Sequence, residues 1–237
     1  MALSDSISSD IQTIIDTNWN KRKGSVVPST DDVALAGGAV ELDATFLYAD
    51  LANSSKMAKE LDRRVAAKIL KSFLATTSRL IKSCDGTVVS FDGDRVMGVF
   101  IGDYRNSNAA RCALKIKYVV SEYIRPKFEK KYESVKDATF TISHGVGIDT
   151  GEVLAVRAGA RGTNDLIWIG RAPNLAAKLS DERESPYHTI ITASVYNRLN
   201  DESKYGGADK NNMWESRSWK FLGDTISVYR SSYHWKP

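Results

Sequence analysis

The sequence predicts an α+β domain in which helices cover one face of an antiparallel sheet, preceded by a separate N-terminal helix. Two observations support this prediction. Short apolar runs of strand character alternate with longer segments whose apolar residues recur every three or four positions. Two of the short runs are joined by Asp92-Gly93-Asp94, which is a strong hairpin signal.

The N-terminal segment is amphipathic. A helix over residues 3–19 is predicted from the apolar positions Leu3, Ile7, Ile11, Ile14, Ile15 and Trp19. The polar stretch that follows, from Lys21 to Gly38, is interpreted as a linker. This divides the chain into a helix with a linker over 1–39 and a folded domain over 40–237. We expect the helix to pack on the main domain or on a second subunit rather than on a membrane.

The main domain shows a regular order of elements. Along the chain we predict a strand over 44–49, a helix over 55–82, strands over 87–91 and 95–101, a helix over 106–128, strands over 139–148 and 152–156 around Asp149-Thr150-Gly151, a strand over 166–169 and a helix that begins with 174–179. The second long helix can be capped by Asn106 or Ser107 and should end near Pro126. The order β-α-β-β-α-β is typical of a ferredoxin-like layer.

Bulk properties exclude several classes of protein. The net charge is +4, from 33 basic and 29 acidic residues, which is too mild to indicate nucleic-acid binding. Cys84 and Cys112 have no paired spacing and the three histidines are scattered, so we expect no disulfide framework, zinc site or histidine-based triad. No apolar run approaches the ~20 residues of a membrane span, and the start lacks a secretory pattern. We therefore expect a cytoplasmic protein.

Two aspartates occupy positions suited to metal binding. Asp50 ends the first predicted strand, and Asp94 lies in the hairpin turn. Carboxylates in such places can offer oxygen ligands to Mg²⁺ or Mn²⁺. Amides at the start of the helix after Asp50 would suit a phosphate. That predicted phosphate-binding segment consists of Ala52, Asn53, Ser54 and Ser55. Taken singly, an aspartate in either place is more often an ordinary turn or cap residue.

Four segments have a more specific pattern when they are read together. They are Phe46-Leu47-Tyr48-Ala49-Asp50-Leu51, Gly93-Asp94-Arg95-Val96-Met97-Gly98-Val99-Phe100, His144-Gly145-Val146-Gly147-Ile148-Asp149-Thr150-Gly151-Glu152-Val153 and Ile169-Gly170-Arg171-Ala172-Pro173-Asn174-Leu175-Ala176-Ala177-Lys178-Leu179. In this order they resemble the catalytic domain of class III adenylate and guanylate cyclases. The resemblance covers about residues 41–230.

The resemblance implies a two-metal nucleotide cyclase. Asp50 and Asp94 would hold two Mn²⁺ or Mg²⁺ ions per site, with the Leu51 carbonyl as a further ligand. Asn174 would orient the ribose, and Lys178 stands where the family has an arginine that stabilises charge on the α-phosphate. The reaction is attack of the ribose O3′ on the α-phosphorus with loss of diphosphate. In the family the aspartates and the asparagine come from different subunits, so a homodimer with two composite sites is expected.

The positions that read the base depart from the family's pattern. Purine cyclases have a lysine four residues before the second aspartate and Asp or Thr seven before the asparagine, whereas this chain has Ser90 and Ile167. An adenine amino group would lack its acceptor, a loss of ~1–3 kcal/mol. Uracil, with two carbonyl acceptors, is a better match. The predicted base-binding residues are Tyr48, Ser90, Arg95, Asn164, Ile167 and Trp168. Tyr48 and Trp168 can also be core aromatics, and Arg95 a solvated hairpin residue.

This pattern of substitutions resembles the bacterial pyrimidine cyclases of the Pycsar anti-phage systems. The resemblance implies cyclic UMP or cyclic CMP as a signal that a separate effector detects. UTP is favoured over CTP because hydrogen-bond donors outnumber acceptors among the predicted base-binding residues. Three alternatives are kept, of which the first is a cytidylate cyclase. The chain can be a degenerate cyclase that senses a nucleotide, because Lys178 lacks the planar fork of arginine. It can be an adenylate cyclase with unusual base contacts. A ferredoxin-like RNA-binding module would need an aromatic Lys/Arg-Gly-Phe/Tyr run that is absent from the sequence.

Overall fold

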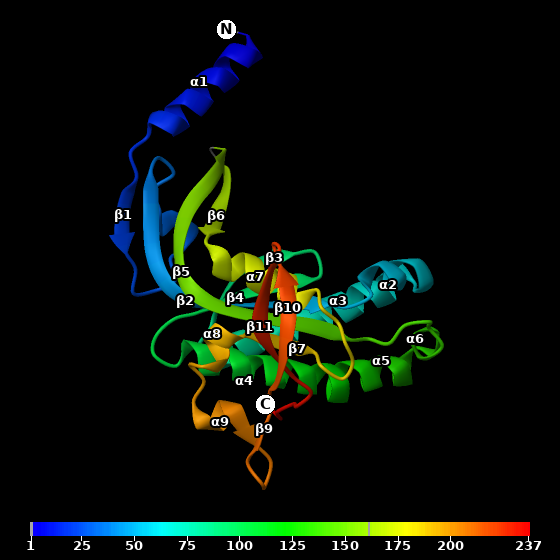
Figure 1. The fold of residues 1–237 in the computed structure, drawn as a ribbon. Coiled ribbons are helices and arrows are strands. Elements are labelled where there is room, and N and C mark those ends of the chain that lie inside the picture. Colours follow the sequence, from blue (N-terminus) through cyan, green and yellow to red (C-terminus); the bar gives the residue numbers. More distant parts are fainter. Residues whose placement is uncertain (1, 161) are drawn as a thin grey trace. The chain divides into compact units, whose positions relative to one another are not determined.

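A computed structural model describes residues 2–160 and 162–237. The chain forms two compact units, and each is described by itself. The larger unit contains residues 44–151 and 171–237, and the smaller unit contains residues 2–43 and 152–170 without residue 161. Strands β2 (Gly38–Leu51) and β5 (His144–Ala160) each contribute residues to both units. The predicted α+β class is confirmed (Figure 1).

The larger unit is built around a mixed sheet. Its strands follow the order β10-β11-β7-β5-β2-β4-β3. The pairs β3–β4, β2–β4, β11–β7 and β10–β11 are antiparallel, and β5–β7 is parallel. The strands are β3 (Thr87–Asp92), β4 (Arg95–Phe100), β7 (Thr189–Thr192), β10 (Glu215–Phe221) and β11 (Asp224–Ser231), and a small separate pair is formed by β8 (Tyr205–Gly206) and β9 (Asn211–Asn212). The predicted hairpin at Asp92-Gly93-Asp94 is therefore the β3–β4 connection.

The helices of the larger unit differ in detail from the prediction. They are α2 (Ser54–Glu60), α3 (Arg63–Ser83), α4 (Arg105–Tyr118), the π-helical turn η2 (Val119–Ile124), α5 (Arg125–Lys131), α6 (Glu133–Lys136), α7 (Arg171–Ser180), α8 (Ala193–Tyr196) and α9 (Asp201–Lys204). The single helix predicted over 55–82 is two helices, because the Asp62 side chain caps α3 by accepting a hydrogen bond of 2.9 Å from the Arg64 amide. Pro126 does not end its helix but lies in the first turn of α5.

Apolar side chains pack on both faces of this sheet. On one face, a large cluster joins α3, α4 and η2 to strand residues such as Ile148 and Ile191. On the other face, α7 forms a smaller cluster with Ile190 and Val228. Successive residues of a strand point to opposite faces, so the neighbours Ile190 and Ile191 belong to different clusters. Figure 1 shows α7 and α4 on opposite sides of the strands. The expectation that helices lie on one face therefore holds for α3 and α4 but not for α7.

Two glycines allow α7 to approach the sheet closely. A Cβ atom at Gly147 would lie 2.1 Å from the Ala176 carbonyl oxygen, and one at Gly145 would lie 2.2 Å from the Ser180 carbonyl oxygen. Both distances are far below a van der Waals contact, so only glycine fits at either position with this backbone. The motif segment over 144–153 thus fixes the position of the helix that carries Asn174 and Lys178.

The smaller unit contains α1 (Leu3–Asp16), β1 (Asn20–Lys23) and the 3-10 turn Thr30–Asp32, together with β6 (Thr163–Ile169). The prediction of a linker over 21–38 is wrong, because β1 pairs in parallel with the first residues of β2.

The turn predicted around Asp149-Thr150-Gly151 is also absent, since β5 runs through it without interruption. The boundary at 39/40 stays a prediction.

Helix α1 ends at Asp16 rather than at Trp19, and none of its residues is buried. Of the predicted packing modes, contact with a second subunit therefore remains a prediction. None of the helices in residues 2–160 and 162–237 is long and apolar enough to cross a membrane.

Candidate active site

Asp50 lies near the end of β2 and is 3% exposed. Its carboxylate oxygen Oδ2 accepts hydrogen bonds from two guanidinium groups, those of Arg95 at 3.2 Å and of Arg183. Burial, and after it the nearby charge of Asp94, raise the pKa of Asp50 above its ordinary value, while Arg183 and Arg95 oppose this rise. The buried Asp50 carboxylate thus lies near one negative side chain, Asp94, and two positive ones, Arg95 and Arg183. This arrangement indicates that the end of β2 favours positively charged groups.

Asp94 follows Gly93 in the β3–β4 turn, where Gly93 has a φ of +58°. This left-handed conformation suits glycine and brings Asp94 next to the end of β2. The Leu51 amide donates a hydrogen bond of 3.3 Å to the Asp94 carbonyl oxygen. The three residues predicted to hold metal ions, Asp50, Leu51 and Asp94, are therefore neighbours in the structure.

The predicted phosphate-binding segment begins directly after Leu51. The Ala52 amide donates to the Ser143 carbonyl oxygen at 2.9 Å, so this amide is already engaged. Asn53 adopts a left-handed conformation with a φ of 64° and precedes the seven-residue helix α2. Its side-chain amide donates to the Thr141 carbonyl oxygen at 3.4 Å. Ser54 and Ser55 are the first residues of α2, and phosphate binding here remains a prediction.

A row of three side chains crosses the strands beside the two aspartates. Ser90 pairs with Met97, and Met97 pairs with Tyr48. Directly paired residues share one face of a sheet, so Tyr48 and Ser90 lie on the same face. This is the face opposite α3, because Ile81 of α3 packs against Gly98, the neighbour of Met97. Arg95 and Asp50 form the next row on that face.

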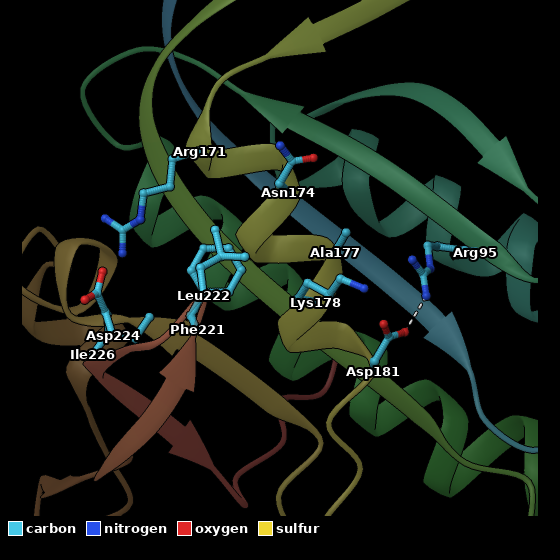
Figure 2. Close-up of a pocket in the computed structure, with 10 residues that line it drawn as sticks. All are labelled: Arg95, Arg171, Asn174, Ala177, Lys178, Asp181, Phe221, Leu222, Asp224 and Ile226. Atoms are coloured by element: carbon cyan, nitrogen blue, oxygen red, sulfur yellow. Dashed lines mark hydrogen bonds and ion pairs between the residues drawn. The ribbon is translucent and has the colours of Figure 1, made fainter.

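Helix α7 presents a polar side to a cleft of about 870 Å³. The cleft is lined by Arg171, Asn174 and Lys178 from successive turns of α7, by Asp181 just after the helix, and by Arg95 from β4 (Figure 2). Its other wall consists of residues at and near the β10–β11 turn, which are Phe221, Leu222, Asp224 and Ile226. The structure thus confirms that Asn174 and Lys178 lie on one face of a helix.

Arg95 connects the two parts of the site. One of its guanidinium nitrogens lies 2.5 Å from an Asp181 carboxylate oxygen and 3.2 Å from Asp50. The cleft around Asn174 and Lys178, however, is lined by neither Asp50 nor Asp94. Within the described part of the chain, the predicted metal ligands and the predicted ribose and phosphate ligands do not share one cavity.

Ile167 and Trp168, also predicted to bind the base, lie on β6 in the smaller unit. They pair with Val156 and Ala155 of β5, and Ile167 is 46% exposed. Asn164, at the other end of β6, accepts a hydrogen bond of 2.5 Å from Arg157 Nε. Their part in base binding stays a prediction.

Three residues of the site were not predicted from the sequence. Arg171 could have been found, because it lies three and seven residues before Asn174 and Lys178 and so shares their helix face. Arg183 and Asp181 carry no such signal. They follow α7 in an irregular segment, and only the folded chain brings them to Asp50 and Arg95.

The fold and this arrangement define a catalytic domain for nucleotides, with carboxylates at a strand end and an asparagine and a lysine on a nearby helix. The family described as "Adenylate and Guanylate cyclase catalytic domain" matches residues 41–216, and the chain belongs to this family. It is therefore a nucleotide cyclase of class III, as the sequence predicted. One solved relative of the fold, the guanylyl cyclase domain of the RhoGC fusion protein from Blastocladiella emersonii, is described as a non-canonical dimer; it has a TM-score of 0.59 at 14% identity and covers 81% of this chain and 97% of its own.

Individual relatives agree with this assignment. A uridylate cyclase from Rhodovulum sp. (strain MB263) is 60% identical over 237 residues, which are 100% of this chain and 99% of the relative. A uridylate cyclase from Xanthomonas perforans is 40% identical over 237 residues, with the same coverage of 100% and 99%. Among solved structures, the guanylyl cyclase Cya2 has a TM-score of 0.68 at 17% identity and covers 83% of this chain and 95% of its own. At this identity the structural likeness supports the fold alone.

Proposed function

We propose that this protein is a uridylate cyclase, which converts UTP to 3′,5′-cyclic UMP and diphosphate. The observation that carries the proposal is the 60% identity over the whole chain to a relative of that name. The base-reading positions support it, because Ser90 and Ile167 cannot supply the charged or acceptor groups that purine cyclases use there.

The residues at the end of β2 fit a pair of divalent cations. Carboxylate and carbonyl oxygens are the ligands that Mg²⁺ and Mn²⁺ prefer, and Asp50, Asp94 and the Leu51 carbonyl supply them. In the structure the positive charge next to Asp50 comes from the guanidinium groups of Arg95 and Arg183. When bound, the metal ions would lower the pKa of the ribose 3′-hydroxyl and neutralise the triphosphate. We propose that Asp50, Leu51 and Asp94 hold them.

The other side chains would position and neutralise the substrate. Asn174 and Lys178 are exposed on the cleft side of α7, where they can reach a ribose and an α-phosphate. In the reaction O3′ bonds to the α-phosphorus, the bond from that phosphorus to the bridging oxygen breaks, and diphosphate leaves with the electron pair. Lys178 would offset the charge that develops on the α-phosphate. Tyr48 and Ser90 would contact the base from the sheet. The other residues proposed to contact the base are Arg95, Ile167 and Trp168.

A homodimer is proposed for the assembled enzyme. Because the cleft of Asn174 and Lys178 contains neither Asp50 nor Asp94, a complete site can form when one subunit contributes the aspartates and the other contributes α7. We also propose that the cyclic nucleotide is a second messenger in anti-phage defence, read by a separate effector protein.

The direct test is to incubate the purified protein with Mn²⁺ and each of ATP, GTP, CTP and UTP, and to identify the products by mass spectrometry. Cyclic UMP should form fastest at equal substrate concentration. Faster formation of cyclic CMP or cyclic AMP would replace the proposed substrate. Binding of a nucleotide without any cyclic product would identify a sensor with a degenerate site.

A further inference from the structure

We propose that Arg171 binds the distal phosphates of the substrate, the part that leaves as pyrophosphate. The inference rests on the proposed function in one respect, namely that a nucleoside triphosphate is cyclised in the cleft beside α7. It adds a substrate-binding residue that the sequence motif does not single out.

The first step of the argument is the position of Arg171. It is the first residue of α7, three residues before Asn174 and seven before Lys178. At 3.6 residues per turn these three side chains lie along one side of the helix. All three are exposed, and all three line the same cleft, as Figure 2 shows. A ligand held by Asn174 and Lys178 would lie along the helix side that begins with Arg171, and in Figure 2 the Arg171 side chain extends away from Lys178, so it would have to turn toward the ligand.

The second step is the availability of its charge. The other arginine of the cleft, Arg95, is engaged by the carboxylates of Asp50 and Asp181. Among the described residues, no carboxylate forms an ion pair with Arg171 or with Lys178, although the charge of Arg171 lies near enough to the buried Asp149 to oppose the rise that burial causes in the pKa of Asp149. In Figure 2 the only dashed line joins Arg95 to Asp181, while Arg171 extends from the opposite end of the cleft. The cleft thus has two cations ready for an anionic ligand, and one is a guanidinium.

The third step is the chemistry of the ligand. A guanidinium presents a planar fork of donors that matches two oxygens of one phosphate, whereas a lysine acts as a single point of charge. Seven residues of helix place Arg171 and Lys178 about 10 Å apart along the axis. If Lys178 binds the α-phosphate, Arg171 is left to bind the far end of the triphosphate. The two side chains are flexible, so their charged groups can lie closer together than the axial spacing of the two residues.

The role in the reaction follows from charge. As O3′ loses its proton to solvent and bonds to the α-phosphorus, the breaking bond leaves its electron pair on the pyrophosphate. Arg171 would stabilise this growing negative charge. The opposite wall carries the apolar side chains of Phe221, Leu222 and Ile226, and Leu222 is 88% exposed, so Arg171 would meet the phosphates in a cleft that is open to solvent. Asp224 is the one lining carboxylate on that wall, and it would weaken pyrophosphate binding.

The test uses the full-length protein with Mn²⁺ and pyrophosphate as the probe. Arg171→Gln should weaken pyrophosphate binding in calorimetry, and pyrophosphate inhibition, by about tenfold or more. It should raise KM by a similar factor and also lower kcat, because the charge on the leaving pyrophosphate grows in the transition state. Inhibition by the cyclic product, which lacks these phosphates, should not change. Arg171→Lys should restore part of the loss, because it keeps the charge without the fork. Asp224→Asn should tighten pyrophosphate binding.

The matched control is Arg79→Gln, which removes an exposed arginine from α3 and should leave pyrophosphate binding unchanged. Thermal denaturation shows whether each variant is folded. Unchanged pyrophosphate binding in folded Arg171→Gln would overturn the inference. The probe contains no base, so a preference for another nucleotide leaves this test intact. If no nucleotide is cyclised at all, the proposed function fails while the pyrophosphate measurement still decides the role of Arg171.

Discussion

Arg95 and Asp50 face each other on the paired strands β4 and β2, with a guanidinium nitrogen 3.2 Å from a carboxylate oxygen. Because Arg95 also contacts Asp181 after α7, a single side chain joins the predicted metal ligand to the helix that carries Asn174. Removing the Asp50 carboxylate therefore affects more than a metal ligand. It also leaves Arg183 without this acceptor.

The two aspartates should consequently differ in their effect on stability. Asp50→Ala removes a buried acceptor of two charged hydrogen bonds, and we expect it to lower the free energy of unfolding by about 1–3 kcal/mol. Asp94→Ala, at a half-buried turn position, should change it by about 0.5 kcal/mol or less. Both variants should lose cyclic product. Urea denaturation at one protein concentration measures the first effect and mass spectrometry the second. Substantial activity in either variant would remove the two-metal assignment.

Subunit mixing tests the composite site. Asp50→Ala and Asn174→Ala should each be inactive alone, but a mixed dimer would contain one site with neither substitution. With random pairing about half of the dimers are mixed, and each has one of two sites, so activity should return to about a quarter of the wild type. Labelled subunits verify exchange by native mass spectrometry. Confirmed exchange without recovery of activity would place the whole site within one chain.

Base preference is tested at the two positions that depart from the purine pattern. Restoring the purine readers with Ser90→Lys and Ile167→Asp should lower kcat/KM for UTP by more than it lowers kcat/KM for ATP. The carboxylate introduced by Ile167→Asp has only acceptors and would not complement the carbonyl groups of uracil, whereas it can accept from the adenine amino group. The matched control is Thr87→Lys with Thr163→Asp, at exposed positions on the same two strands. Equal loss with both nucleotides would show that these positions do not read the base.

Acid should destabilise the fold through His144. This side chain is 1% exposed, and neither ring nitrogen has a hydrogen-bond partner among the described residues. Burial, and then the nearby His188, Lys117 and Arg125, hold the pKa of His144 well below its ordinary value. The unfolded chain takes up a proton below pH ~6.5, whereas the folded chain does not. The contribution of neutral His144 to the free energy of unfolding is therefore fully present above pH ~6.5. Below that pH the free energy of unfolding falls by about 1.4 kcal/mol per pH unit.

The measurement is urea denaturation between pH 7.5 and pH 5.5. His144→Phe, which keeps a ring beside Phe73 and the stacked ring of His188, should reduce this dependence and leave the part due to His188, whose pKa burial also lowers. His234→Phe replaces an exposed histidine and serves as the control. A slope that is the same in wild type and His144→Phe would assign the acid sensitivity to another group.

Local signals explain what could be predicted of the fold. The β3–β4 hairpin was predictable because Asp92-Gly93-Asp94 specifies its turn within three residues. Turn chemistry was misleading at Asp149-Thr150-Gly151. There the buried Asp149 carboxylate accepts a hydrogen bond of 2.5 Å from Thr192, and this distant contact supports an extended strand. The pairing of β10 and β11 also escaped prediction, since most residues of β10 are polar and the apolar alternation is limited to Trp219 and Phe221.

The candidate site also has some features that a local sequence pattern predicts and others that depend on contacts between distant residues. Asn174 and Lys178 were placed on one helix face from their spacing alone, which is a property of any helix. The approach of Arg183 to Asp50 joins residues 133 positions apart, and no local pattern reports it. The sequence places Asp50 at the end of a strand, but no local pattern indicates that its side chain is buried. Its surroundings come from three separate segments of the chain.

Helix α7 rests on a cluster with only four buried apolar residues, Leu175, Leu179, Ile190 and Val228, whereas α3 and α4 share a far larger one. Amide hydrogen exchange should therefore be faster at α7, the helix that holds Asn174 and Lys178, than at α3 or α4. A bound nucleotide would slow that exchange, because a ligand stabilises whatever conformation it requires. Part of the binding energy of the substrate would then be used to order α7. The affinity of the enzyme for the nucleotide would therefore depend on how well α7 packs on Ile190 and Val228 of the sheet.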